Sequence, residues 1–223
     1  LLRSLAEQHR TDQVPIEDFL EKEKTLYSQA KQELIIRHFF QDRRDGFFVD
    51  VGCFHWEQSS TTCYLERHLG WSGIAIDAQD KFAEGWKKHR PRSKFFPVAV
   101  TDKSGETITF YQTGTDSKRN GGTSSMELTN INKLKKRTEI DVREITVPTI
   151  TLNDLLDREG VNAIDFLSMD INGAEPIALK GFDIQRFRPE LVHVEASPHR
   201  QEELAAYFER NGYKRIDEYL EYD

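Results

Sequence analysis

Phe47-Phe48-Val49-Asp50-Val51-Gly52-Cys53 is the stretch that decides the fold of this chain. Its apolar run is typical of a strand buried on both faces, and its glycine suits a tight turn after the strand. A second stretch of this kind, Gly73-Ile74-Ala75-Ile76-Asp77, follows further along the chain. An acid at the tip of the second strand suits the two hydroxyl groups of a ribose. Together the two stretches predict a nucleotide-binding α/β domain.

The composition is that of a protein with one well-buried core. The chain has 223 residues, 37% of them hydrophobic and 31% charged, which argues against disorder and against membrane insertion. No apolar window approaches the roughly 18–20 residues of a membrane helix, so we expect no membrane span. The net charge of -7 disfavours a nucleic-acid partner. A small-molecule or glycan acceptor is the partner we expect.

The two cysteines, Cys53 and Cys63, do not have the spacing of a metal-binding knuckle. Low cysteine content and no secretory signal fit a reducing compartment, so the sequence predicts a cytoplasmic protein.

One domain with an N-terminal appendage is expected. Residues 1–45 predict an N-terminal helical appendage, because apolar residues recur at helical spacing over 16–40. Residues 46–223 predict the main domain, in which strands alternate with helices as in a parallel sheet with crossover helices. The expected strands are 47–51, 73–77, 94–100, 145–149, 163–169, 191–194 and 213–222, and the expected helices are 58–69, 80–89, 151–160 and 200–211.

A hairpin and a glycine-rich segment interrupt this alternation. Residues 106–111 alternate like a half-exposed strand, and the turn signal at 102–105 predicts an edge hairpin after the third parallel strand. Residues 113–125 are rich in Gly, Ser, Thr and Asn and predict a mobile loop. This loop is either a plain surface connection or a lid over the substrate.

Four of the expected strands end in acids: Asp50, Asp77, Asp170 and Glu195. Ligands of open α/β sheets bind at the carboxyl ends of the strands, so these acids are expected to ring one crevice. Any one of them alone is as well explained as a cap of the following helix. The stretch that begins at Gly52 lacks the second and third glycines of a dinucleotide cradle, which disfavours a nicotinamide-dependent oxidoreductase. A nucleoside cofactor without a polyphosphate, such as S-adenosylmethionine, tolerates these residues.

Several motifs resemble those of the FkbM-type methyltransferases. They are Phe48-Val49-Asp50-Val51-Gly52, Ser59-Ser60-Thr61-Thr62, Gly70-Trp71-Ser72-Gly73-Ile74-Ala75-Ile76-Asp77, Ala99-Val100-Thr101-Asp102-Lys103-Ser104-Gly105, Asp165-Phe166-Leu167-Ser168-Met169-Asp170-Ile171-Asn172-Gly173-Ala174-Glu175 and Arg188-Pro189-Glu190-Leu191. The resemblance spans residues 32–216, and the motifs occur in the family's order. It implies a class I methyltransferase (Rossmann-like) α/β fold, with a seven-stranded, mostly parallel sheet, one antiparallel strand, helices on both faces and the N-terminal helix in addition.

The resemblance also implies S-adenosylmethionine as the methyl donor and assigns residues to it. In this assignment Asp77 holds the ribose, and Asp170 lies beside the transferred methyl group. The remaining cofactor-binding residues are Asp50, Gly52 and Cys53 at the methionine end, Thr61 in the following loop, and Ala99 and Val100 near the adenine. Two residues depart from the family's pattern: Trp56 stands at a common glycine, and Asn172 at a common acid.

Methyl transfer from a sulfonium requires little beyond alignment of the reactants and exclusion of water. A hydroxyl acceptor also needs a group that takes its proton, and the candidates are Asp170, Glu195, His55 and His199. The two histidines are better explained without catalysis, His55 by packing in its loop and His199 by the start of the following helix. Asp170 and Glu195 are also candidates to share a Mg²⁺ ion, which has hard oxygen ligands. The sequence therefore predicts an S-adenosylmethionine-dependent O-methyltransferase of a sugar or small natural product. The alternative is a non-catalytic interaction module of the same fold with a degenerate cofactor site, which Trp56 and Asn172 favour.

Overall fold

A computed structural model describes residues 2–4, 15, 18–19, 26–113, 124–126, 131–132, 135 and 141–219. Its main sheet has the strand order β10-β1-β9-β8-β2-β3-β4. The strands of this sheet are β1 Leu2–Ser4, β2 Phe47–Val51, β3 Ser72–Ile76, β4 Ser93–Phe96, β8 Phe166–Met169, β9 Leu191–Val194 and β10 Tyr213–Arg215. The five strands β9, β8, β2, β3 and β4 run parallel, whereas β1 is antiparallel to both of its neighbours. The predicted α/β fold with a mostly parallel central sheet is confirmed.

Helices pack on both faces of this sheet. They are α2 Gln32–Phe40, α3 Cys63–Leu69, α4 Ala83–His89, α6 Leu152–Arg158, α7 Glu175–Lys180, α8 Ile184–Phe187 and α9 Gln201–Arg210, with short 3₁₀ turns at Asp80–Phe82 and Asp217–Tyr219. Val49 and Val51 pack with residues of α6, α7, α8 and α9. Phe48, which precedes Val49 in sequence, packs with residues of α2 and α3 on the opposite face. This alternation explains why β2 has apolar residues on both faces, because successive side chains of a strand point to opposite faces.

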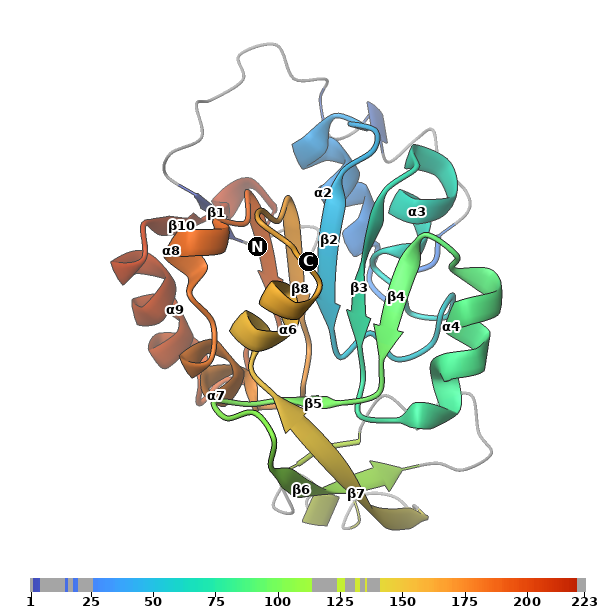
Figure 1. Cartoon of the computed structure of the whole chain (residues 1–223). Helices are drawn as coiled ribbons and strands as arrows, with labels where there is room; N and C mark the ends of the chain where they lie inside the picture. Colours follow the sequence, from blue (N-terminus) through green and yellow to red (C-terminus); the bar gives the residue numbers. More distant parts are fainter. Residues whose placement is uncertain are drawn as a thin grey trace.

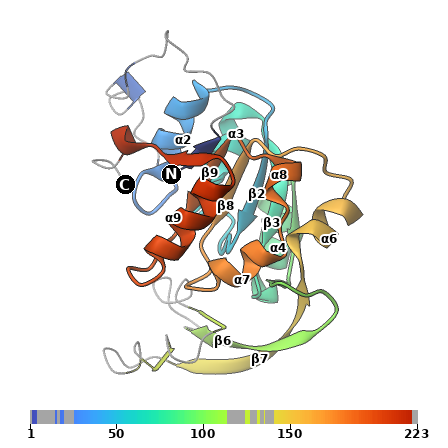
Figure 2. The same cartoon turned by 90° about the vertical axis from the view of Figure 1, so that its left-hand side faces the viewer.

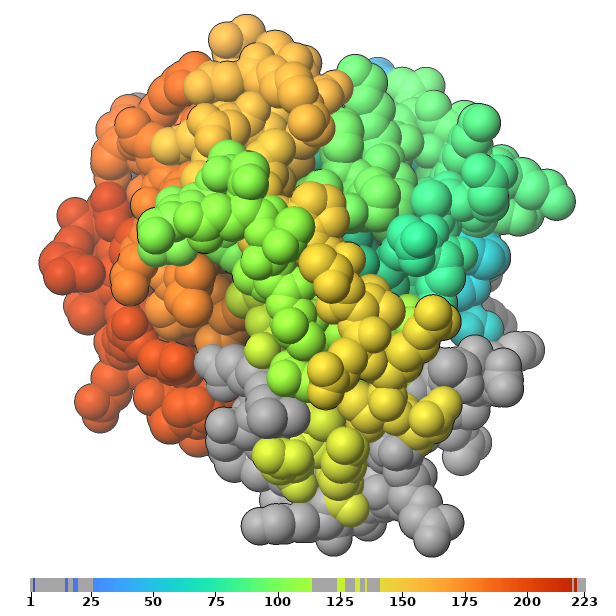
Figure 3. All heavy atoms as spheres, turned by 60° about the horizontal axis from the view of Figure 1, so that its bottom comes forward, coloured from blue at the N-terminus to red at the C-terminus, as the bar shows by residue number. Residues whose placement is uncertain are grey.

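A second, three-stranded sheet lies at the carboxyl end of the parallel strands (Figure 1). Its order is β5-β7-β6, and its strands are β5 Ala99–Val100, β6 Thr107–Thr113 and β7 Val142–Ile150. Figure 2 shows β6 and β7 apart from the main sheet and its helices. In Figure 3, which faces this end of the molecule, the green and yellow residues of these strands lie across the centre of the surface.

The small sheet corrects two sequence predictions. The strand expected over 94–100 is broken after Phe96, because Pro97 lacks an N–H group and cannot continue the ladder. The edge hairpin is also wrong, since the turn at 102–105 leads from β5 to β6, and these two strands do not pair. Both strands pair with β7 instead, antiparallel to β6 and parallel to β5.

The N-terminal region differs from the expected helix over 16–40. Residues 26–31 are not helical, and α2 begins at Gln32. Residues 2–4 form the strand β1, although the sequence placed them in a helical appendage. The helix expected over 58–69 begins only at Cys63. The division into domains at residue 45 stays a prediction. None of the helices in the described ranges is long and apolar enough to cross a membrane.

Candidate functional site

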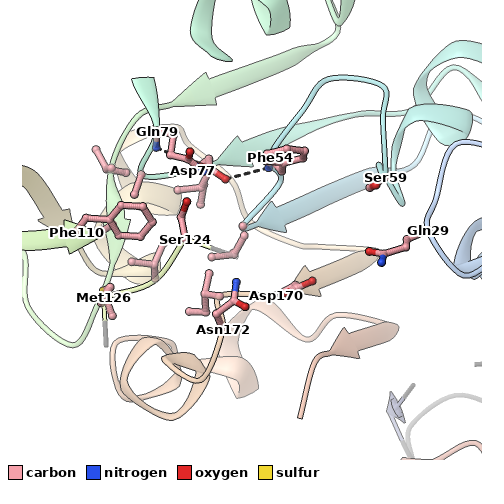
Figure 4. A pocket seen from close by; sticks show the side chains of 18 residues that line it. Gln29, Phe54, Ser59, Asp77, Gln79, Phe110, Ser124, Met126, Asp170 and Asn172 are labelled. Atoms are coloured by element: carbon pink, nitrogen blue, oxygen red, sulfur yellow. Dashed lines mark hydrogen bonds between the residues drawn. The ribbon is translucent and has the colours of Figure 1, made fainter. Parts of the chain in front are cut away.

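A cavity of about 390 Å³ opens at the carboxyl ends of the parallel strands, between them and the small sheet (Figure 4). Val51 of β2 and Asp77 after β3 line it from the main sheet, and Phe110 of β6 lines it from the small sheet. Its volume lies within the range of about 300–1,000 Å³ that is usual for small-molecule sites. The place agrees with the rule that open α/β sheets bind ligands beyond the carboxyl ends of their strands.

Asp77 presents an oriented carboxylate to the cavity. The Phe54 N–H donates to its Oδ2 at 3.0 Å, and the Gln79 N–H donates to its Oδ1 at 2.8 Å. Burial raises the pKa of Asp77, and these two backbone donors act in the opposite direction by stabilising the charge. Each carboxylate oxygen can accept a further hydrogen bond. Asp77 can therefore bind a pair of hydroxyl groups without rearranging.

An apolar slot lies next to Asp77. Ala99 and Phe110 form it with Val147, and Ala78 and Met126 pack against them. Four of these residues, Ala78, Ala99, Phe110 and Met126, line the cavity. A slot with an aromatic wall suits a flat aromatic ring of a ligand. The buried Gln79, whose Oε1 accepts from Gln112 at 3.2 Å, supplies a polar group beside it.

Gly52 brings two strand ends into close contact at the floor of the cavity. Its φ is +83°, and a Cβ at this position would lie 1.8 Å from the carbonyl oxygen of Asp170. Both the backbone angle and this contact exclude a side chain. The Asp170 N–H also donates to the Val51 carbonyl at 2.9 Å. The glycine thus fixes the turn after β8 against the turn after β2.

Asp170 carries an unusual carboxyl group at this floor. Its side chain is exposed to the open cavity, yet the surrounding protein limits its hydration. Desolvation, together with the hydrogen bond and the charge of the neighbouring Glu195, raises the pKa of Asp170 to about 8. Glu175 and Asp50 add smaller repulsions in the same direction. A carboxyl group of this kind exchanges a proton near neutral pH, as a general base must.

Asp50 has a different environment from Asp170. It is buried outside the lining of the cavity, and the Thr62 Oγ1 donates to its Oδ2 at 2.8 Å. Burial raises the pKa of Asp50 to about 6, and Thr62 and the Arg90 charge limit the rise. Arg90 is fully buried and forms an ion pair with Glu66 at 2.8 Å. Asp50 is therefore placed to support the loop after β2.

Two other predicted cofactor residues also lie outside the cavity lining. Cys53 is buried in a cluster with Ala75 and Trp86. Thr61 lies 3.4 Å from the Ser168 hydroxyl, measured between the two Oγ atoms. Gly52, Asp77, Ala99, Val100 and Asp170, by contrast, all line the cavity, as expected for cofactor-binding residues. Their assignment to a cofactor stays a prediction.

The histidines and Trp56 lie outside the cavity lining as well. His55 accepts hydrogen bonds at Nδ1 from the N–H groups of Glu57 and Gln58, at 3.1 and 3.0 Å. His199 is exposed near the start of α9. Trp56 stacks on His55 with ring centroids 3.8 Å apart, and a Cβ on Gly85 would lie 1.9 Å from the indole. Trp56 therefore does not fill the cavity.

The described residues contain no cluster of three or more His, Cys, Asp or Glu side chains that could hold a metal ion. A Mg²⁺ site is not supported.

Several lining residues were not assigned from the sequence. Phe110 belongs to a strand that the sequence predicted from its alternation. The sequence did not predict that this strand pairs with β7 and that Phe110 lines the cavity. Ser124 and Met126 flank the end of the glycine-rich segment, whose residues 114–123 lie outside the described ranges. The lid at 113–125 therefore stays a prediction. Gln29 gave no sequence signal, because it comes from outside every motif and reaches the cavity only through the fold.

The fold and the cavity define an α/β protein with a nucleoside-sized site at the carboxyl edge of its parallel strands. The family model of the methyltransferase FkbM domain matches residues 44–215 of the chain. The chain therefore belongs to the FkbM methyltransferase family. No curated protein and no solved structure gave a significant match.

Proposed function

We propose that this chain is an S-adenosylmethionine-dependent methyltransferase that methylates a hydroxyl group of a neutral sugar or small natural product. The observation that supports it most is one continuous cavity lined by Asp77 beside an apolar slot and by Asp170. These are the groups that a nucleoside and a reacting centre require within one site. Membership in the methyltransferase family supports the same reaction.

The residues of the cavity fit this cofactor. Asp77 would accept hydrogen bonds from the ribose hydroxyls, and Ala99 and Phe110 would flank the adenine. The only charged side chains among the described lining residues are Asp77 and Asp170, both acidic, which suits a cationic ligand. When bound, S-adenosylmethionine supplies a methyl group on a positively charged sulfur. The protein then has to align the acceptor, exclude water and remove one proton.

Asp170 is the residue we propose for the proton of the acceptor hydroxyl. Its raised pKa suits a group that is protonated in part near neutral pH and accepts a proton during the reaction. Glu195 is proposed to assist by sharing that proton, because the two carboxyl groups are hydrogen-bonded. His55 is less suited to this role, since its Nδ1 already accepts two backbone hydrogen bonds.

The acceptor end of the cavity is proposed to lie at Gln29 and Ser59. Figure 4 shows these two side chains toward the Asp170 side, away from Phe110 and Met126. An amide and a hydroxyl group can donate to and accept from the hydroxyl groups of an acceptor. No Lys or Arg occurs among the described lining residues, so a phosphate or carboxylate would lack a countercharge there. These features support a neutral, hydroxyl-bearing acceptor.

The experiment that tests this function is calorimetric titration with S-adenosylmethionine, S-adenosylhomocysteine and NAD, each with and without Mg²⁺. We expect saturable binding of the first two ligands, no binding of NAD and no effect of Mg²⁺. The titration is followed by a methyl-transfer screen of matched acceptors, in which each neutral sugar is paired with its phosphate. Cofactor binding without transfer to any acceptor would favour the non-catalytic interaction module. Binding of NAD alone would overturn the proposal.

A cytoplasmic location remains part of this proposal and rests on cysteine usage. Cys53 and Cys63 are both buried free thiols. Fluorescence microscopy of the tagged full-length protein checks it.

A further inference from the structure

Glu175 holds the turn that follows Asp170. It is the first residue of α7, and its side chain is fully buried. Its Oε1 accepts hydrogen bonds from the N–H groups of Ile171 at 3.0 Å and Gly173 at 3.2 Å. Bonds from backbone donors to a carboxylate are among the stronger hydrogen bonds in proteins. One oxygen of Glu175 therefore restrains two of the three residues between Asp170 and Ala174.

This turn requires a restraint. Asn172 has a φ of 54° and Gly173 a φ of 98°, so two consecutive residues adopt left-handed conformations. Asparagine tolerates this region better than other non-glycine residues, but the conformation still costs free energy that the surroundings must offset. Asp170 and Asn172 line the cavity, and the Asp170 carbonyl packs against Gly52. A change in the turn would therefore displace one wall of the cavity.

The second oxygen of Glu175 has a high energetic cost. Its Oε2 is buried and has no hydrogen-bond partner among the described residues. An unpaired buried polar atom is destabilising, and more so in a charged group. Burial raises the pKa of Glu175, the backbone hydrogen bonds act in the opposite direction, and the nearby Glu195 adds a smaller repulsion. A glutamate in the first turn of a helix interacts favourably with the helix dipole, and the unpaired Oε2 offsets part of that gain.

We propose that Glu175 is a positioning residue, which fixes the Asp170–Gly173 turn through two backbone N–H groups and influences Asp170 through its charge. The restraint on the turn follows from the structure and does not depend on the proposed function. The effect on cofactor and proton rests on the proposed function.

Three substitutions separate the two roles. Glu175→Gln keeps an oxygen for the two N–H groups but removes the charge. Glu175→Asp keeps the charge, but its shorter side chain withdraws the oxygen from them. Glu175→Ala removes both. Glu202→Ala, at an exposed position on α9, is the matched control.

The first measurement is amide hydrogen exchange at Ile171 and Gly173 by nuclear magnetic resonance, which requires no cofactor. We expect protection in the native protein, in Glu175→Gln and in Glu202→Ala. We expect exchange at least tenfold faster at both amides in Glu175→Asp and Glu175→Ala, with the protection of β2 unchanged. Unchanged protection of the turn in a folded Glu175→Ala variant would overturn the proposal.

The second measurement is calorimetric binding of S-adenosylhomocysteine. Loss of the two hydrogen bonds is expected to weaken binding about tenfold or more in Glu175→Asp and Glu175→Ala. Glu175→Gln is expected to stay within about twofold of the native protein. Native affinity in a folded Glu175→Ala variant would contradict the link from turn to cavity. If the native protein does not bind this ligand, the proposed function fails, whereas the exchange data still decide the restraint.

The third measurement isolates the charge of Glu175. The ratio of affinities for S-adenosylmethionine and S-adenosylhomocysteine is expected to rise with pH, because ionised Asp170 attracts a sulfonium but not a thioether. The acids that act on Asp170 are Glu195, Glu175 and Asp50. Removal of one like charge should move the midpoint of this rise to lower pH in Glu175→Gln. A midpoint that does not move in Glu175→Gln would remove the electrostatic part of the proposal.

Discussion

Two groups of acids at the same sheet edge have opposite environments. Asp50, near the end of β2, is buried beside Thr62 and near the cation Arg90, which itself pairs with Glu66. Asp170, after β8, has Glu195, Glu175 and Asp50 as its main electrostatic neighbours, and all of them are acids. Asp50 therefore has its hydrogen-bond donor and its countercharge within the protein. For Asp170, no cation is among the main electrostatic influences from the described residues, so a ligand could supply its countercharge.

This difference distinguishes support from function. A carboxylate whose partners are all protein groups is stabilised in one position and has little capacity left for a ligand. A carboxylate surrounded by other acids destabilises the folded state and is retained where a ligand or a proton uses it. We therefore assign Asp50 to support of the loop after β2, and we propose Asp170 for chemistry. The following substitutions test that contrast.

The largest effect is expected for Asp170→Asn. Loss of a general base is expected to reduce turnover by about 10²–10⁴-fold, whereas cofactor affinity should change much less. Transfer of labelled methyl from S-adenosylmethionine to an acceptor found in the screen measures turnover, and calorimetry measures affinity. Asp183→Asn, at an exposed carboxylate, is the control. Equal turnover of the variant and the native protein would remove Asp170 from the mechanism.

The same variant tests a pH dependence of stability that the raised pKa of Asp170 predicts for the native protein. Asp170 has its pKa raised from 3.8 to about 8 in the folded protein, so the native state binds this proton more tightly than the unfolded state. Its contribution to stability is therefore full below about pH 4 and is lost as the pH rises through about 8. Between pH 5 and pH 9, the free energy of unfolding in urea should decrease less in Asp170→Asn than in the native protein. Parallel curves for the two proteins would contradict the raised pKa.

A large effect on stability is expected for Arg90→Met. Removal of one partner of a buried ion pair leaves Glu66 uncompensated, at a cost of about 3–5 kcal/mol in the free energy of unfolding. Urea unfolding at constant pH measures it. The double variant Arg90→Met/Glu66→Met should lose less than the sum of the single variants, because the two residues are coupled. If Arg90→Met lowered the free energy of unfolding by less than about 1 kcal/mol, the buried acids near Arg90 would not depend on it as a countercharge.

A smaller effect is expected for Asp77→Ala. Loss of an acceptor for the ribose hydroxyls should weaken cofactor binding by about 1.5–3 kcal/mol. Calorimetry with S-adenosylhomocysteine measures the change, and Asp80→Ala, at an exposed carboxylate nearby, is the control. If the folded Asp77→Ala variant retained native affinity, the ribose would have to bind elsewhere.

The smallest effect is expected for Gln29→Ala. Loss of one hydrogen bond to the acceptor should raise its KM by about 0.5–1.5 kcal/mol in free energy, with cofactor affinity unchanged. Initial rates at saturating S-adenosylmethionine measure KM, and Gln58→Ala, an exposed residue outside the cavity lining, is the control. A change in cofactor affinity without a change in acceptor KM would place the acceptor at another part of the cavity.

Much of the main sheet was predictable because its signals are local. The apolar run of β2 ends at a glycine, and β9 follows a proline-containing turn and has the predicted bounds 191–194. The capping of α6 by Thr151, whose side chain accepts from the Asp154 N–H, also follows from neighbouring residues. The small sheet was not predictable, since β6 and β7 pair across a long intervening segment. Local alternation indicates a strand but not its partner.

The sequence by itself determined that acids collect at one edge of a parallel sheet, because strand ends follow from hydrophobic pattern and turn residues. Only the tertiary structure decided which acids face the cavity. Asp50 lies on the face of β2 where Thr62 can reach it, whereas Asp170 lies in the turn beyond β8. The tertiary structure also places Gln29 and Phe110 at the same cavity. Burial and countercharge depend on neighbours distant in sequence, and those neighbours define the chemistry of a carboxylate.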